Sequence, residues 1–216
     1  MTKKKYSEIY KHYEDTLQKH GSNFQGMDWP DEADLHARFE VMLGLLKYGQ
    51  KPDKTASVLD LGCGIGLLLA YCKKFHPALD LDYYGIDISE KMIDGAKSIH
   101  KDESFEARDI LENPLPDDSY DYIVMNGLLT EKLTLPQDAM VEFAQQIIHA
   151  AYKSSKTGIA FNVMSSHVDW KRDDLFHWPL DELMSFLTKE ISRNVIFRMD
   201  YGLYEFTTYV FKNKNT

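Results

Sequence analysis

Three glycines at alternate positions follow an aspartate that lies near the end of a short apolar run, in the order Asp60, Gly62, Gly64 and Gly66. The run before them suits a buried strand, and an apolar helical stretch begins at Leu67. Glycine leaves the backbone open to a ligand and permits positive φ in a tight turn. The helix after the turn presents free N–H groups and the positive end of its dipole. The pattern therefore predicts a nucleotide-like ligand lying across the end of a strand.

The spacing of the glycines distinguishes two kinds of nucleotide-like ligand. A dinucleotide-binding turn needs Gly-x-Gly-x-x-Gly, and Leu67 stands where its last glycine would be. The run instead resembles the first motif of class I S-adenosylmethionine-dependent methyltransferases. An ordinary strand-to-helix turn is the alternative for a glycine run taken alone. The resemblance implies that the turn holding S-adenosyl-L-methionine consists of Asp60, Gly62, Cys63, Gly64 and Gly66.

A second segment, Tyr83 to Ser89, is similar to the next motif of the same family. It predicts a strand ending in Asp87, with Ser89 as the N-cap of a helix. A carboxylate at this position can accept both hydroxyls of a ribose. The resemblance gives that role to Asp87, with Ile88 beside it in the cofactor site. The alternative is that Asp87 only helps to cap the helix.

Two further strand ends complete the similarity, which is specific up to residue 127. A short third strand ends at Asp109, and the resemblance implies that Asp109 binds the adenine amino group while the backbone of Ile110 contacts the ring. A solvated loop acid is the alternative for Asp109. A fourth strand ends at Asn126-Gly127, where Asn126 is placed to contact the cofactor or the acceptor. Asn-Gly is also a common turn pair.

Upstream of the glycine turn, two helices are expected to cover the cofactor cleft. The first spans residues 6–19, and the second begins near residues 28–31 with Pro30 in its first turn. Trp29 and the pair Arg38-Phe39 are similar to residues upstream of the first motif in many small-molecule methyltransferases. By this resemblance Arg38 binds the cofactor carboxylate, and the ring of Trp29 lies near the sulfonium. A core aromatic and a solvated charge are the alternatives.

The tyrosines of the first predicted helix, Tyr10 and Tyr13, are further candidates for a position near the sulfonium. A long loop after the fifth predicted strand carries candidates for the acceptor side. His167 could accept a proton from an acceptor hydroxyl or amine, and Asp169 could orient it. The alternative is a surface loop held to the body by Trp170 and Trp178. Methyl transfer does not require a base, because alignment of the nucleophile with the methyl group and sulfur supplies much of the acceleration.

Strands and helices alternate through most of the chain, which predicts parallel strands with helices on both faces of a sheet. Near the C-terminus, Tyr201-Gly202 predicts a hairpin turn and thus an antiparallel strand. The expected fold is α/β, with a Rossmann-like, seven-stranded, mostly parallel sheet, an antiparallel C-terminal strand and an N-terminal helical cover. We expect one methyltransferase domain over 1–216, with the cover at 1–50 and the core at 55–212. The predicted strands lie near 57–61, 82–87, 104–108, 120–126 and 158–164.

Composition narrows the expected partners. The net charge of −9 argues against a nucleic-acid substrate, and the chain has no apolar run of the roughly 20 residues that a membrane span needs. The two cysteines, Cys63 and Cys72, have no metal-ligand spacing, so no metal is expected and a cytoplasmic location is favoured. The chain reads Asn126-Gly127-Leu128-Leu129 where methyltransferases of exocyclic base amines carry Pro-Pro. A small-molecule acceptor is expected, and a homodimer is left open.

The sequence thus predicts a methyltransferase that transfers the methyl group of S-adenosyl-L-methionine to a small molecule by in-line displacement. His167 and Asn126 are the candidates closest to the chemistry. Two other functions remain as alternatives. One is a nicotinamide-dependent oxidoreductase, and the other is an S-adenosylmethionine-binding module without turnover, since a fold does not fix a function.

Overall fold

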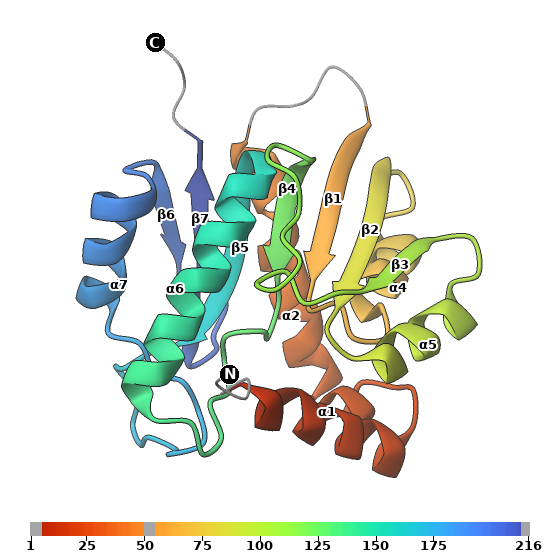
Figure 1. The fold of residues 1–216 in the computed structure, drawn as a ribbon, viewed down its shortest axis with the longest axis horizontal. Coiled ribbons are helices and arrows are strands. Elements are labelled where there is room, and N and C mark those ends of the chain that lie inside the picture. Colours follow the sequence, from red (N-terminus) through yellow and green to blue (C-terminus); the bar gives the residue numbers. More distant parts are fainter. Residues whose placement is uncertain (1–5, 50–54, 213–216) are drawn as a thin grey trace.

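The computed structural model describes residues 6–49 and 55–212. It contains one seven-stranded sheet with the strand order β3-β2-β1-β4-β5-β7-β6, as Figure 1 shows. β7 is antiparallel to both of its neighbours, and the other pairs are parallel. The predicted fold class is confirmed. The strands are β1 (Ala56–Leu61), β2 (Leu81–Asp87), β3 (Ser104–Ala107), β4 (Tyr120–Met125), β5 (Ser155–Met164), β6 (Val195–Arg198) and β7 (Glu205–Phe211).

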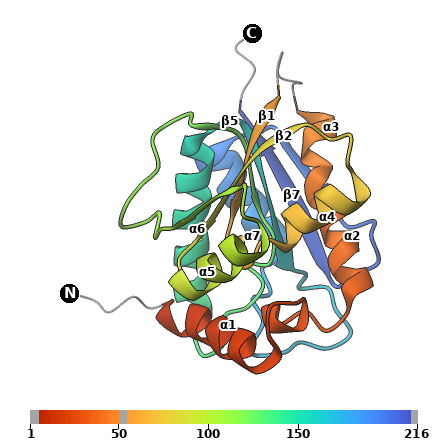
Figure 2. The ribbon, with the colours of Figure 1, turned by 90° about the vertical axis from the view of Figure 1, so that its right-hand side faces the viewer.

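Helices cover both faces of this sheet. In Figure 2, α6 lies on one side of the sheet, and α2, α3 and α4 lie on the other. Figure 1 shows α1 lying across the edge at which β1, β2 and β4 end. In the part of the chain described here, no helix is both long and apolar enough to cross a bilayer. The helices are α1 (Ser7–His20), η1 (Gln25–Met27), α2 (Glu32–Leu43), α3 (Leu45–Tyr48), α4 (Leu67–Phe75), α5 (Glu90–Ile99), α6 (Gln137–Ser154), α7 (Leu180–Phe186) and the π-helical η2 (Leu187–Ile191).

The central strands are apolar on both faces, because each face is packed against helices. Along β1, Leu59 and Leu61 belong to the cluster that contains α6 and α7. Val58, which precedes Leu59 and points to the opposite face, belongs to the cluster with α2, α3 and α4. Successive side chains of a strand point to opposite faces, so a short run of apolar residues joins both layers of the core. This packing fixes the strand ends that carry the polar side chains.

The start of α2 differs from the prediction. The helix begins at Glu32, and the carboxylate of Asp31 caps it by accepting hydrogen bonds from the backbone of Ala33 (2.7 Å) and Asp34 (3.1 Å). Pro30 therefore precedes the cap and does not lie in the first turn. An aspartate is a strong N-cap, and it outweighs the preference of proline for the first turn.

Candidate active site

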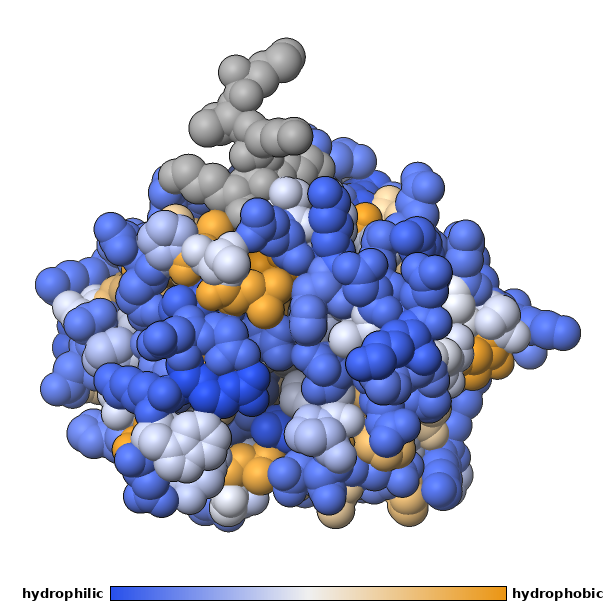
Figure 3. Space-filling view, turned by 90° about the horizontal axis from the view of Figure 1, so that it is seen from below, coloured by the Kyte–Doolittle hydropathy of each residue, from blue (hydrophilic) through white to orange (hydrophobic). Residues whose placement is uncertain are grey.

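A cavity lies at the edge where β1, β2 and β4 end, beneath α1. Figure 3 looks at this edge of the molecule, whose outer surface is mostly hydrophilic with separate hydrophobic patches. Nine of the residues predicted from the sequence to bind the cofactor line the cavity. They are Trp29, Asp60, Gly62, Cys63, Asp87, Ile88, Asp109, Ile110 and Asn126.

The glycine turn forms one wall. Gly62, Gly64 and Gly66 all have positive φ, of 78°, 53° and 80°. A side chain on Gly64 would meet the end of Met27, since an added Cβ would lie 2.2 Å from its methyl carbon. Gly64 and Gly66 are not part of the cavity lining. Gly66 instead forms the left-handed N-cap of α4, so these two glycines shape the turn from behind.

Asp87 ties the glycine turn to the next helix. Its Oδ2 accepts a hydrogen bond from the backbone N–H of Gly64 (2.9 Å), and its Oδ1 accepts one from that of Ser89 (2.9 Å). Ser89 in turn is the N-cap of α5, as predicted. Burial raises the pKa of Asp87, and these two backbone donors counter the rise. The carboxylate thus braces two adjoining turns while it faces the cavity.

Asp60 is the buried acid below the turn. Its Oδ2 accepts a hydrogen bond from the hydroxyl of Tyr83 at 2.7 Å. Burial raises the pKa of Asp60 to about 7, and the nearby Asp87 adds to this rise. Burial and a second acid at the adjacent strand end therefore both favour the protonated form of Asp60.

Asp109 lies at the other end of the cavity, after β3. Its Oδ2 accepts a hydrogen bond from the hydroxyl of Tyr6 (2.7 Å), and its Oδ1 accepts one from the backbone of Leu111 (3.0 Å). The ring of Tyr6 also stacks on Phe143 of α6, with centroids 4.7 Å apart. Beside them, Ile110 is buried. Aromatic and apolar side chains therefore surround one carboxylate at this end of the cavity.

The sequence analysis missed part of the lining. Tyr6, Phe143, Ile147, Met27 and Leu128 line the cavity without having been expected there. For Tyr6 the signal was present, because Tyr6, Tyr10 and Tyr13 are spaced by four and three residues and share one face of a helix. All three tyrosines line the cavity.

Asn126 offers an unused acceptor to the cavity. Among the described residues its Oδ1 is buried and has no hydrogen-bond partner. The next residue, Gly127, has φ of 78° and donates its backbone N–H to Asn162 (2.8 Å). The ring of Trp29 packs against this glycine, where an added Cβ would lie 2.8 Å from it. The end of β4 is thus held in place while the Asn126 side chain faces the cavity.

Arg38 does not lie where the sequence analysis expected it. It is absent from the cavity lining. Its Nε and Nη2 both donate to Oε2 of Glu205 on β7, each at 2.9 Å. The guanidinium also lies over the ring of Trp29, 4.7 Å from its centroid. The expected contact with a cofactor carboxylate is therefore replaced by a buried ion pair that supports Trp29, which does line the cavity.

The acceptor-side expectations also need correction. His167 is exposed and lies outside the cavity, and Asp169 accepts a hydrogen bond from Tyr204 (3.0 Å), so it does not orient His167. Trp178 is buried, packs against Phe176 and stacks on Phe186, so it does hold the loop to the body, whereas Trp170 is 65% exposed.

The strand order with one reversed strand, and the glycine turn braced by an acid on the next strand, define a methyltransferase-type α/β protein. The chain belongs to the methyltransferase domain family, whose model matches residues 52–191. Over 164 residues it is 34% identical to the Rv1506c protein of Mycobacterium tuberculosis, whose name assigns it provisionally to the methyltransferases. That match covers 72% of this chain and 93% of the mycobacterial protein.

Two solved structures share the fold. Magnesium protoporphyrin IX methyltransferase from Synechocystis PCC 6803, with bound S-adenosylhomocysteine (SAH), superposes with a TM-score of 0.64 at 15% identity, over 96% of this chain and 95% of that one. The plantazolicin methyltransferase BpumL, in complex with a pentazolic desmethyl analogue and SAH, gives 0.56 at 20% identity, over 96% and 99%. At these identities the likeness is one of fold.

Proposed function

We propose that this protein is an S-adenosylmethionine-dependent methyltransferase that acts on a small-molecule acceptor. The observation that carries the proposal is the cavity itself. It joins a glycine turn, three acids at three strand ends and the unpartnered amide oxygen of Asn126 under an aromatic helix. Because the chain belongs to the methyltransferase domain family, we interpret this combination as a site for methyl transfer.

The residues at the cavity fit this cofactor. When bound, S-adenosyl-L-methionine supplies a methyl group on a positively charged sulfur. The buried Oδ1 of Asn126 can accept a hydrogen bond from an ammonium group. This bond would give the oxygen the partner that it lacks. A Cβ at Gly62 would lie 3.2 Å from Leu128, so glycine keeps the turn open. Asp87 would hold the ribose hydroxyls, and Asp109 with Ile110 the adenine.

The way in which α1 covers the cavity favours a small acceptor. The only residue of α1 that is buried among the described ones is Ile9, and polar contacts attach this helix to the rim. They join Tyr6 to Asp109, Glu8 to Thr134, and Glu14 to Ser89. A helix with a single buried residue opens at a lower cost than a core element does, and α1 would close over a ligand that fits beneath it. The two structural neighbours described above are named for or bound to such molecules, magnesium protoporphyrin IX in one case and a pentazolic desmethyl analogue in the other.

The chain's own part in the reaction would be positioning. Tyr10 and Tyr13 would offer aromatic rings to a cation, whereas the ring of Trp29 already carries the guanidinium of Arg38. The closed cover would exclude water. Aligning an acceptor nucleophile with the methyl group is worth a large part of the barrier. No base is required by this scheme, and His167 has no part in it.

We further propose that 1–216 form one methyltransferase domain and that it works in the cytoplasm. Cys63 and Cys72 are both free and buried in the described structure, which suits a reducing compartment.

Calorimetric titration with S-adenosyl-L-methionine, SAH and NAD tests the cofactor. We expect micromolar binding of the first two and none of NAD. Transfer of labelled methyl from the cofactor to a metabolite extract then tests turnover. Binding of NAD alone would contradict the proposal, and binding of SAH without any transfer would support the non-catalytic alternative.

A further inference from the structure

Outside the cavity lining, three potential metal ligands from separate segments meet behind the cover. His12 comes from α1, Asp28 is the C-cap residue of η1, and Glu131 follows β4. One ligand atom of each lies within 4.8 Å of those of the other two. The Nε2 of His12 is 2.7 Å from Oδ2 of Asp28 and 3.8 Å from Oε2 of Glu131. The three atoms are therefore close enough together to hold one metal ion.

This cluster has more acceptors than cations. The Oε2 of Glu131 is buried and has no hydrogen-bond partner among the described residues. Burial together with the nearby Asp28 raises the pKa of Glu131 to about 7. The neighbouring cation, Arg172, is engaged by Asp174 through its Nε (3.0 Å) and its Nη2. The two carboxylates, Asp28 and Glu131, therefore share the imidazole of His12 as an ion-pair partner.

We propose that His12, Asp28 and Glu131 bind one divalent transition-metal ion, of which Zn²⁺ and Mn²⁺ are the best candidates. One imidazole nitrogen with two carboxylate oxygens is a donor set used for such ions. Mg²⁺ and Ca²⁺ prefer oxygen ligands alone. A charge of +2 offsets both carboxylates and gives Oε2 of Glu131 the partner that it lacks.

The site would fasten the cover. Each ligand of the cover is next in sequence to a residue of the cavity wall: His12 to Tyr13, and Asp28 to Met27 and Trp29. A metal bound there would tie α1 and η1 to the segment after β4. By holding the cover over the cavity, the metal would tighten ligand binding there, and a bound ligand would tighten metal binding by the same factor. The sequence analysis expected no metal, since these ligands form no short motif.

Calorimetry on untagged protein, stripped of metal with a chelator, tests the site without any cofactor present. We expect one ZnCl2 or MnCl2 per chain with a dissociation constant on the order of micromolar, and no comparable binding of MgCl2. His12→Gln and Glu131→Gln should each weaken the binding about 100-fold. Absence of binding by the unaltered protein, or unaltered binding by both variants, would overturn the proposal.

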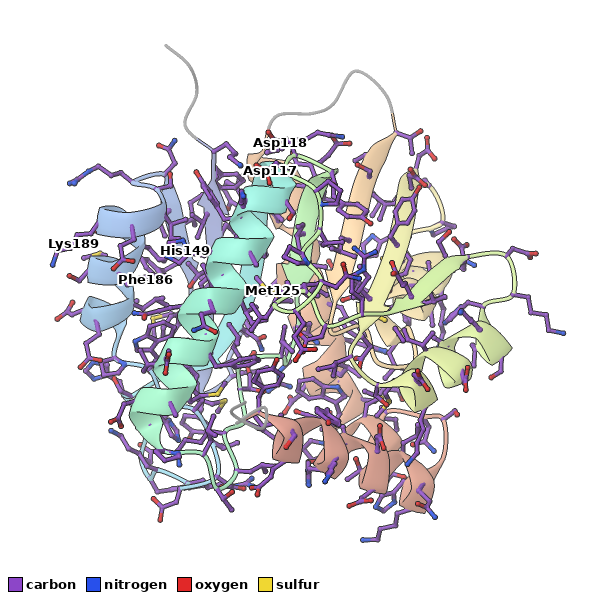
Figure 4. The ribbon with its side chains drawn as sticks, in the orientation of Figure 1. Asp117, Asp118, Met125, His149, Phe186 and Lys189 are labelled. Carbon is purple, nitrogen blue, oxygen red and sulfur yellow. The ribbon has the colours of Figure 1, made fainter. Side chains whose placement is uncertain are left out.

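His149→Gln is the matched control, because it removes a histidine that also pairs with an acid. His149 lies on α6 beside Phe186 of α7, away from α1 (Figure 4), and is 3.4 Å from Glu190. We expect its metal affinity to equal that of the unaltered protein. Circular dichroism on each variant separates a lost ligand from a lost fold. An equal loss of affinity in folded His149→Gln would show non-specific histidine binding and would refute the site.

A separate titration measures the coupling between the metal site and ligand binding in the cavity. SAH titrations with and without ZnCl2 should show several-fold tighter binding with the metal for the unaltered protein, and no difference for Glu131→Gln. Equal SAH affinity in both conditions would refute the fastening of the cover. The metal titration contains no SAH, so a failure of the proposed cofactor would be seen separately.

Discussion

Arg38 donates two hydrogen bonds to a single carboxylate oxygen of Glu205, a residue 167 positions further along the chain. The other oxygen of Glu205 accepts a hydrogen bond from Asn162 (2.9 Å), and Asn162 accepts the backbone N–H of Gly127. A continuous polar network therefore runs from α2 through β7 and β5 to the end of β4. It supports the cavity from outside, because Trp29 packs between Arg38 and Gly127.

Breaking this pair should cost stability first. The side chains of Arg38 and Glu205 are 12% and 1% exposed, so Arg38→Met leaves a buried, unpaired carboxylate. We expect a loss of about 3 to 5 kcal/mol in the free energy of unfolding by urea. The double variant Arg38→Met/Glu205→Gln should lose less, because no charge is left alone. An Arg38→Met protein with full stability but weakened SAH binding would instead support a direct contact with the cofactor.

Asp87→Asn keeps the shape of the side chain and removes its charge. We expect SAH affinity to fall by roughly 1.5 to 3 kcal/mol, about 10- to 100-fold, since hydrogen bonds to charged groups lie in that range. Calorimetry measures the change. Asp94→Asn is the control, because Asp94 is an exposed acid on the same helix that Asp87 helps to cap. An equal effect of the two substitutions would show a general charge effect and no specific role for Asp87.

Gly64→Ala should disturb the site by backbone strain and by displacing the flexible end of Met27, which lines the cavity. Gly64 has φ of 53°, and its added Cβ would lie 2.2 Å from Met27. Gly202 has φ of 77° with nothing within 4 Å, so Gly202→Ala isolates the strain, about 1 to 2 kcal/mol. Thermal unfolding and SAH titration compare them. We expect Gly64→Ala to be the less stable and to lose SAH affinity at least about tenfold, whereas Gly202→Ala binds normally. Normal SAH binding by Gly64→Ala would refute a role for this glycine.

The pH dependence of stability should carry a contribution from Asp60. Its pKa is raised to about 7 in the folded protein, mainly by burial, against an ordinary value of 3.8. Between these values the native state holds a proton that the unfolded chain has lost, so the free energy of unfolding falls as pH rises from about 4 to about 7. The contribution, on the order of 4 kcal/mol, is present below the lower pKa and lost above the higher one.

Urea unfolding at about pH 5 and about pH 8, with a chelator present, measures this effect. Asp60→Asn should flatten the difference between the two pH values. Glu131, whose pKa is also raised to about 7, contributes with the same sign, so Glu131→Gln serves as a second reference. An Asp60→Asn protein with the same pH dependence as the unaltered one would show that this carboxyl is not the source.

The sequence predicts most of the sheet and the part of the cavity that lies at its edge. Asp60, Asp87 and Asn126 end adjacent parallel strands, and parallel strands bring their carboxyl ends to one edge. Such a local pattern carries no information about distant partners. The pairing of Arg38 with Glu205 depends on where β7 enters the sheet, which is a property of the whole fold.

The same limit explains the remaining differences. His12, Asp28 and Glu131 meet only once α1 has folded across the strand ends, so their positions in the sequence give no motif. The loop after β5 contains two histidines, His167 and His177, and the sequence alone does not distinguish their surroundings. The structure exposes His167 and fixes His177, whose Nδ1 lies 2.7 Å from the carbonyl oxygen of Ser165.

The place of β7 in the sheet has a consequence for synthesis on the ribosome. α1 and α2 emerge early, whereas Glu205 emerges only after six of the seven strands have been made. Until then Arg38 has no partner, and the edge of β5 that β7 will occupy stays open. An open strand edge is a template for pairing with another chain. Nascent or truncated chains that stop before β7 are therefore the ones we expect to associate with each other instead of folding.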